Sequence, residues 1–210
     1  MLLLQEVQRA QVRRIARALG SRSQHWGLKH WPVRVWAEGM AVVGVTVPLQ
    51  VRSYPVTRRW EVWSWRRRLI QIARIEGLTV VHVHLTPHGP TSEQDRDREV
   101  GWLLDRVAPA DDLVAGGDFN AEPGDALFGR LRAVGLRDAW PTAHPDDPDG
   151  GLSNWSGRRN RPATRRIDYL WVAPGVDVVD VTVPGYGGPG FDRFPALSDH
   201  LPVTVAMTYE

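Results

Sequence analysis

The sequence predicts an α/β or α+β protein built from many short strands and a few helices. Apolar or alternating runs typical of strands recur along the chain, and glycine, proline and asparagine turn signals separate them. A few other stretches repeat apolar residues at helical spacing. A chain of 210 residues with 42% hydrophobic content suits one sizeable core, and no internal repeat is visible. We therefore expect a single domain over residues 1–210.

The expected elements follow one another closely along the chain. A short buried strand at 2–7 leads into a helix at 8–19, whose apolar residues share one face and which stops at Gly20. Glu76-Gly77 has the pattern of a tight hairpin turn. Strands are expected at 2–7, 39–47, 60–75, 78–85, 111–119, 167–172, 176–183 and 201–207. Helices are expected at 8–19, 93–107 and 126–134, and loops at 21–37, 141–165 and 185–190.

Composition excludes several classes of protein. The chain has no cysteine, which excludes disulfides, thiolate metal sites and a thiol nucleophile. The start lacks the features of a secretory signal, and no stretch approaches the roughly 20 apolar residues of a membrane helix. We expect a soluble, cytoplasmic protein without an obligate protein partner. The net charge of +2 is too small to indicate a nucleic-acid partner, and Lys29 is the only lysine beside many arginines, a bias typical of a GC-rich genome.

Polar residues recur where predicted strands begin or end. Gly117-Asp118-Phe119-Asn120 follows an apolar run, and the alternation of side chains along a strand points Asp118 and Asn120 to one side. Asp168 interrupts the apolar strand of Arg166-Ile167-Asp168-Tyr169, where a lone carboxylate would be costly. Ser198-Asp199-His200 precedes the last strand. These positions predict that several polar groups gather at one edge of a sheet.

These motifs, in this order with Gln5-Glu6, Gly39-Met40-Ala41 and His84-Leu85, resemble the endonuclease/exonuclease/phosphatase superfamily of deoxyribonuclease I-like phosphoesterases. Each motif alone occurs by chance in many proteins, but the ordered set extends from Leu2 to Val205. The resemblance implies a four-layer α/β/β/α sandwich, in which two mainly antiparallel sheets pack together and helices flank both outer faces.

The resemblance also implies roles for individual residues. Glu6 would bind Mg²⁺ or Mn²⁺, with Asp199 against the metal or its waters. Asp118 would orient or deprotonate the attacking water, and Asn120 and His84 would contact the phosphate or the leaving group. Asp168 would fix and charge the imidazole of His200.

Structural alternatives exist for three of these residues. Glu6 could satisfy donors at a helix start, Asp118 could form an Asx turn, and His200 could be a hydrogen-bonded core histidine. His82 is interpreted as a packing or supporting residue. His88 is expected to be exposed, and Asp138, in a D-x-W motif, to be structural.

Arginine gathers in two stretches. One combines Trp60, Trp63 and Trp65 with arginines 58, 59, 66, 67 and 68. This cluster could stack nucleic-acid bases and contact phosphates. The favoured interpretation is a sheet whose tryptophan face lies in the core and whose arginines lie along the other face. The other, 155–166, carries arginines 158, 159, 161, 165 and 166 just before Asp168, and is the better candidate for gripping an anionic substrate.

One departure from the family pattern concerns the first strand. Family members normally begin with an asparagine-bearing strand before the Q-E strand, whereas this chain starts directly at the Q-E strand. A misplaced start codon is the favoured explanation. Exposed strand edges are then expected, and an extended chain should be more stable and more active.

The resemblance therefore implies a metal-dependent phosphoesterase that acts by direct attack of water on a phosphate ester, with nucleic acid among the candidate substrates. The alternative is an inactive family member that binds an anionic ligand or a partner.

Overall fold

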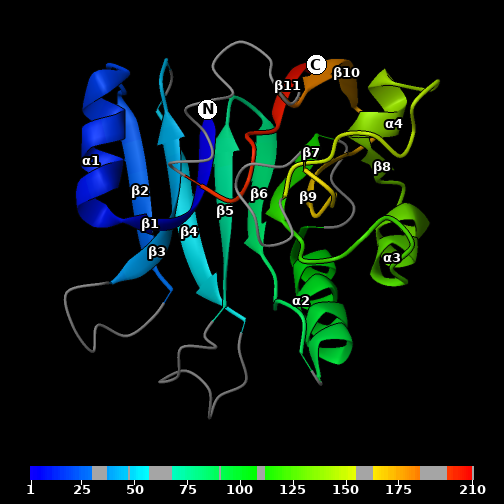
Figure 1. Ribbon diagram of the computed structural model, residues 1–210. Helices are drawn as coiled ribbons and strands as arrows, with labels where there is room; N and C mark the ends of the chain where they lie inside the picture. The colour runs from blue at the N-terminus through cyan, green and yellow to red at the C-terminus, as the bar shows by residue number, and fades with distance from the viewer. Residues whose placement is uncertain are drawn as a thin grey trace.

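A computed structural model describes residues 1–29, 37–46, 48–56, 68–89, 91–107, 112–154, 163–184 and 198–209 (Figure 1). The helices are α1 (Arg9–Ala18), α2 (Ser92–Val107), α3 (Leu127–Ala133) and α4 (Ala139–Ala143). The strands are β1 (Leu2–Gln8), β2 (Ser23–Leu28), β3 (Glu38–Gly44), β4 (Gln50–Pro55), β5 (Leu69–Ile75), β6 (Leu78–His84), β7 (Leu113–Asp118), β8 (Arg137–Asp138), β9 (Asp168–Val172), β10 (Val176–Thr182) and β11 (Thr204–Tyr209).

The described strands form three sheets. The largest has six strands in the order β4-β5-β6-β7-β9-β8, a second has the order β1-β3-β2, and β10 pairs with β11. All pairs are antiparallel except β6 with β7, which helix α2 connects. The predicted hairpin is confirmed, because β5 and β6 pair through the turn at Glu76-Gly77.

The β1-β3-β2 sheet and the six-stranded sheet pack face to face between two layers of helices. On one outer face, Val12 and Ala16 of α1 pack on Ala41 and Val43 of β3. On the other, α2 and α3 cover the six-stranded sheet, and Figure 1 shows α1 on the left and these two helices on the right. Apolar residues of both sheets, Val42 of β3 among them, fill the layer between them. The predicted four-layer fold is confirmed.

Several elements differ from the sequence prediction. The segment 21–37 was expected to be a loop, but it contains β2, whose sequence Ser-Gln-His-Trp-Gly-Leu has no apolar alternation and which forms because it pairs with β3. Strands β4 and β8 and helix α4 were also missed. The strand expected from 60 begins at Leu69 in the described part, and the last strand begins at Thr204 rather than at 201.

Some predictions fall outside the described residues. These are the basic tryptophan cluster apart from Arg68, the arginines at 158, 159 and 161, and the glycine-rich loop at 185–190. Within the described ranges, no helix is long and apolar enough to cross a membrane.

Candidate active site

Three polar residues form a row across the ends of adjacent strands. His84 at the end of β6 is the register partner of Asp118 at the end of β7, and Asp118 is in turn the partner of Asp168, the first residue of β9. Parallel strands end at the same edge of a sheet. The row therefore brings His84, Asp118 and Asp168 from three chain segments to one edge of the six-stranded sheet.

Asp118 and Asn120 hold each other in place. The Asn120 backbone N–H donates to Asp118 Oδ1 at 2.8 Å, and the Asn120 amide donates to Asp118 Oδ2 at 3.1 Å and to the Leu85 carbonyl. The Asx turn considered as an alternative is thus present. It forms together with a φ of 50° at Asn120, a left-handed conformation that is uncommon outside glycine. Such strained residues cluster at functional sites.

Burial changes the acidity of Asp118. Loss of solvation raises the pKa of its carboxyl group from 3.8 to about 7, and the negative charge of Asp168 adds to this effect. A carboxylate whose pKa lies near neutrality is well matched to accept a proton from water.

Glu6 lies on β1 at an irregularity in the strand. The β1–β3 register shifts between Leu4 and Val7, and Glu6 has a φ of 52°. Its neighbour Gln5 is anchored to the other sheet, since its amide donates to Nε2 of the fully buried His82, whose Nδ1 donates to Gln71. His82 thus supports the strand that carries Glu6. The Glu6 side chain itself remains 59% exposed.

His84 lies between charged groups. Its Nε2 is 3.7 Å from Asp118 Oδ2 and 4.0 Å from Glu6 Oε1, while Lys29 Nζ lies 3.2 Å from its Nδ1. Burial, followed by the charges of Lys29 and Arg68, lowers the pKa of His84 well below its usual value. The imidazole is therefore neutral at neutral pH.

Asp168 and His200 form the expected pair. His200 Nδ1 donates to Asp168 Oδ2 at 2.7 Å, and the Ser153 hydroxyl donates to the same oxygen at 2.6 Å. Burial acts to lower the pKa of His200, but the hydrogen bond and charge of Asp168 outweigh it and raise this pKa to about 9. His200 is therefore an imidazolium at neutral pH.

Asp199 is exposed next to His200. Its charge contributes to the raised pKa of His200, and its backbone carbonyl accepts a hydrogen bond from Asn154. It thus lies at the edge of the site, and its assignment as a metal ligand stays a prediction.

The donor set for a divalent cation is small. Among the described residues, no group of three or more His, Asp or Glu side chains is arranged to hold a metal ion. Glu6 nevertheless offers an exposed carboxylate, and Mg²⁺ in proteins takes one or two carboxylates together with waters and substrate phosphate. The residues fit such an ion if water and phosphate oxygens complete its shell.

Three residues were not identified as part of this site from the sequence, although Arg68 had been named in the basic tryptophan cluster. Lys29 follows β2 and is 2% exposed, with Nζ 3.4 Å from Glu6 Oε1. Burial, and to a lesser extent the charge of Arg68, lowers the pKa of Lys29 to about 8. Arg68 is also buried, which lowers its pKa, while the charges of Glu99, Glu6 and Asp118 act in the opposite direction. Ser153 is the third. The lone lysine of the chain was the one available signal, and it was attributed to codon bias.

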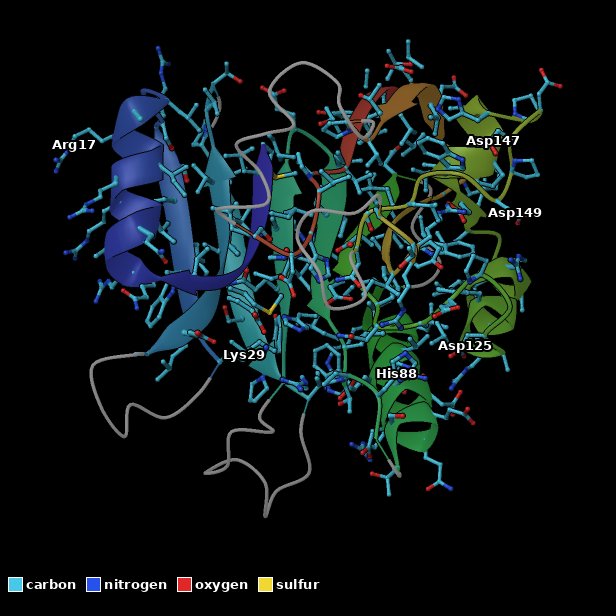
Figure 2. The ribbon with its side chains drawn as sticks, in the orientation of Figure 1. Arg17, Lys29, His88, Asp125, Asp147 and Asp149 are labelled. Atoms are coloured by element: carbon cyan, nitrogen blue, oxygen red, sulfur yellow. The ribbon has the colours of Figure 1, made fainter. Side chains whose placement is uncertain are left out.

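The arginine-rich stretch before Asp168 divides into two roles. Arg165 lies at the rim, where it pairs with Glu122 and contacts the exposed His88. Arg166 is buried against Asp138, so it stabilises the fold and is not free to bind a substrate. His88 and Lys29 both lie on the lower side of the view in Figure 2.

The site therefore combines a buried carboxyl group of near-neutral pKa, an exposed carboxylate, an imidazolium and two buried cations. These groups can neutralise an anionic substrate while one of them accepts a proton from water.

The chain matches the model of a known protein family. A family model described as the endonuclease/exonuclease/phosphatase family matches residues 1–200. A search of curated proteins found no match.

Solved structures share the fold. An endonuclease/exonuclease/phosphatase from Beutenbergia cavernae is 23% identical with a TM-score of 0.71; the match covers 99% of this chain and 62% of that one. The human nocturnin catalytic domain with bound sulfate is 17% identical, with a TM-score of 0.72 and coverage of 100% and 80%. The Neisseria 3′ phosphatase NExo bound to a product DNA hairpin is 22% identical, with a TM-score of 0.72 and coverage of 99% and 88%. This chain thus spans less than two thirds of the Beutenbergia protein.

Proposed function

Because this chain belongs to the endonuclease/exonuclease/phosphatase family, whose members hydrolyse phosphate esters, we propose that it is a divalent-metal-dependent phosphoesterase that cleaves a phosphodiester. The observation that carries this proposal is the row of His84, Asp118 and Asp168, which joins a proton acceptor to an Asp168–His200 pair at one sheet edge.

Each residue has a defined task in this proposal. Asp118 orients the attacking water and accepts its proton, since its raised pKa suits a base near neutrality. The His200 imidazolium, held by Asp168, neutralises charge that develops on the phosphate. Asn120 and the neutral His84 donate hydrogen bonds to phosphoryl or leaving-group oxygens.

Glu6, with Asp199 at the edge of the site, would hold Mg²⁺ or Mn²⁺. When bound, the cation withdraws charge from the phosphoryl oxygens. Two proteins with a similar fold were solved with an anion or a nucleic acid bound: the nocturnin domain contains a sulfate anion, and NExo contains a product DNA hairpin. These support a phosphate-ester substrate, and nucleic acid is one candidate.

A hydrolysis panel tests the proposal. The protein is assayed with Mg²⁺ and with Mn²⁺ on plasmid DNA, an aryl phosphodiester, an aryl phosphomonoester and an inositol phosphate. We expect cation-dependent hydrolysis of a diester, lost in Glu6→Gln and Asp118→Asn. Asp177→Asn, on an exposed position of β10, is the matched control and should retain activity. Failure to hydrolyse any substrate with either cation would contradict the proposal.

An inactive protein that binds anions is the second candidate. Lys29 favours it, because this buried ammonium already neutralises part of Glu6. This alternative would be supported if the protein binds inorganic phosphate but hydrolyses no substrate of the panel.

A further inference from the structure

Lys29 is the only lysine in a chain with 26 lysine and arginine residues. Every other basic position uses arginine, which carries a wide planar group with five donors, whereas lysine carries a compact ammonium. Lys29 directly follows β2, and its backbone N–H donates to the Glu38 carbonyl of β3. Its side chain is 2% exposed. The position therefore holds a small cation fixed inside the protein at the edge of the candidate site.

The ammonium makes an asymmetric ion pair. Lys29 Nζ lies 3.4 Å from Glu6 Oε1 and 3.2 Å from His84 Nδ1. A buried charge is costly unless it is paired, yet its carboxylate partner is 59% exposed. The cation is thus the fixed member of the pair, and one oxygen of Glu6 is already neutralised before any metal ion arrives.

A second buried cation strengthens this effect. Arg68 is 4% exposed, and the charges of Glu99, Glu6 and Asp118 act on it, that of Glu99 most strongly. A divalent cation that approaches Glu6 therefore meets the Lys29 ammonium, 3.4 Å from Glu6 Oε1, and the positive charge of Arg68 adds to the repulsion. It also finds few protein ligands, since the described residues gather no cluster of three or more acidic or imidazole groups.

A phosphate group removes both obstacles. Its negative charge offsets the positive side chains, and its oxygens accept charge-assisted hydrogen bonds from them. The same oxygens can also complete the shell of a magnesium-type cation.

We propose that Lys29 makes the binding of a divalent cation at Glu6 conditional on a bound phosphate group. Substrate phosphate then enters before the cation or together with it. This inference rests on the proposed function, because it takes the phosphate to be that of the ester substrate.

Titration of the purified protein with Mn²⁺ at neutral pH tests this order. Free Mn²⁺ is followed by electron paramagnetic resonance, with and without inorganic phosphate, and each titration is corrected against a protein-free blank. For the unmodified protein we expect weak Mn²⁺ binding alone and binding about tenfold or more tighter with phosphate. Equal affinity under both conditions would overturn the proposal without any variant.

Lys29→Met removes the charge and keeps a side chain of similar length. In this variant, Mn²⁺ should bind about tenfold tighter than in the unmodified protein when phosphate is absent. Added phosphate should tighten its binding by a smaller factor than in the unmodified protein, because the phosphate then only supplies ligand oxygens and offsets Arg68. Phosphate-free Mn²⁺ affinity equal to that of the unmodified protein, in a variant with a normal melting transition, would refute the role of Lys29. Arg130→Met is the control, since it removes one positive charge from the exposed α2–α3 pair with Asp97 and should behave like the unmodified protein.

The binding measurement and the hydrolysis measurement test two separate proposals, so either proposal can be contradicted without the other. Phosphate-dependent Mn²⁺ binding in a protein that hydrolyses no ester would uphold this inference and contradict the proposed function. Cation-dependent hydrolysis with phosphate-independent Mn²⁺ affinity would do the reverse.

Discussion

His200 and Asp168 lie 32 positions apart in the chain, yet Nδ1 of the imidazole donates to Oδ2 of the carboxylate at 2.7 Å. The Ser153 hydroxyl donates to the same oxygen. The carboxylate is therefore held from two sides, and its charge keeps His200 protonated although the imidazole is largely buried.

The pH profile of kcat/KM should be bell-shaped. Asp118, with a pKa of about 7, must lose its proton to act as a base, so activity should rise as pH increases to about 7. His200, with a pKa of about 9, must keep its proton, so activity should fall above about 9. Hydrolysis rates across this range, at saturating cation, give the two limits. Activity that does not fall below about pH 7 would contradict the assignment of Asp118 as the base, and activity that does not fall above about pH 9 would contradict the role of the His200 imidazolium.

Asp168→Asn should lower turnover by about two to four orders of magnitude, because the imidazolium loses the charge that stabilises it. The basic limit of the pH profile should also move to lower pH, since the raised pKa of His200 depends on Asp168. Ser153→Ala, which leaves the carboxylate in place, should have a smaller effect on both quantities. Unchanged turnover in folded Asp168→Asn would show that the pair has no catalytic role.

Asp118→Asn should abolish hydrolysis, and the stability of the variant relative to the unmodified protein should rise with pH. The folded-state pKa of Asp118 is raised from 3.8 to about 7, so the ionised carboxyl group is disfavoured in the folded protein. Its cost to stability grows as pH rises through this window and stays constant above it. A neutral amide avoids this cost. The melting temperature of the variant, compared with that of the unmodified protein, should therefore increase by a few degrees between about pH 4 and pH 7. A difference that does not depend on pH would contradict the raised pKa.

Gly117→Ala should strongly destabilise the protein. Gly117 has a φ of 137°, and an added Cβ would lie 2.1 Å from the Val83 carbonyl oxygen. We expect a loss of about 2 kcal/mol or more in the free energy of unfolding, measured by chemical denaturation. Gly129→Ala is the matched control. Gly129 is on the exposed side of α3 with no atom within 4 Å of an added Cβ, and the substitution should stabilise the helix by up to about 1 kcal/mol.

His82→Leu should cost about 2 kcal/mol in unfolding free energy, because Gln5 and Gln71 would lose their buried hydrogen-bond partner. The loss should also weaken Mn²⁺ binding in the presence of phosphate, since Gln5 anchors the strand that carries Glu6. Adding Gln5→Leu to His82→Leu should recover part of the stability, as removal of both partners leaves fewer unpaired groups. Additive losses in the double variant would show that the two side chains are not coupled.

The sequence alone identified most strands, three of the helices and the residues at the strand ends. It could do so because these signals are local. Alternation and helical spacing report which side of an element faces the core, and the ordered polar motifs mark where strands end. Asp118 and Asp168 were found in this way, whereas His84 and the roles of all three came from the family resemblance; strand pairing then aligned them.

Only the tertiary structure revealed the charges around Glu6. Lys29 follows a strand without an apolar pattern, and Arg68 stands in a run of arginines, so neither residue had a local signal of burial. Similarly, Arg165 and Arg166 are neighbours in sequence, but one lies at the rim and the other is buried against Asp138. Such differences depend on how the two sheets pack and on which distant side chains meet between them. The sequence determined which groups lie at the sheet edge, whereas the packing of the sheets decided which of them are buried, charged and in contact.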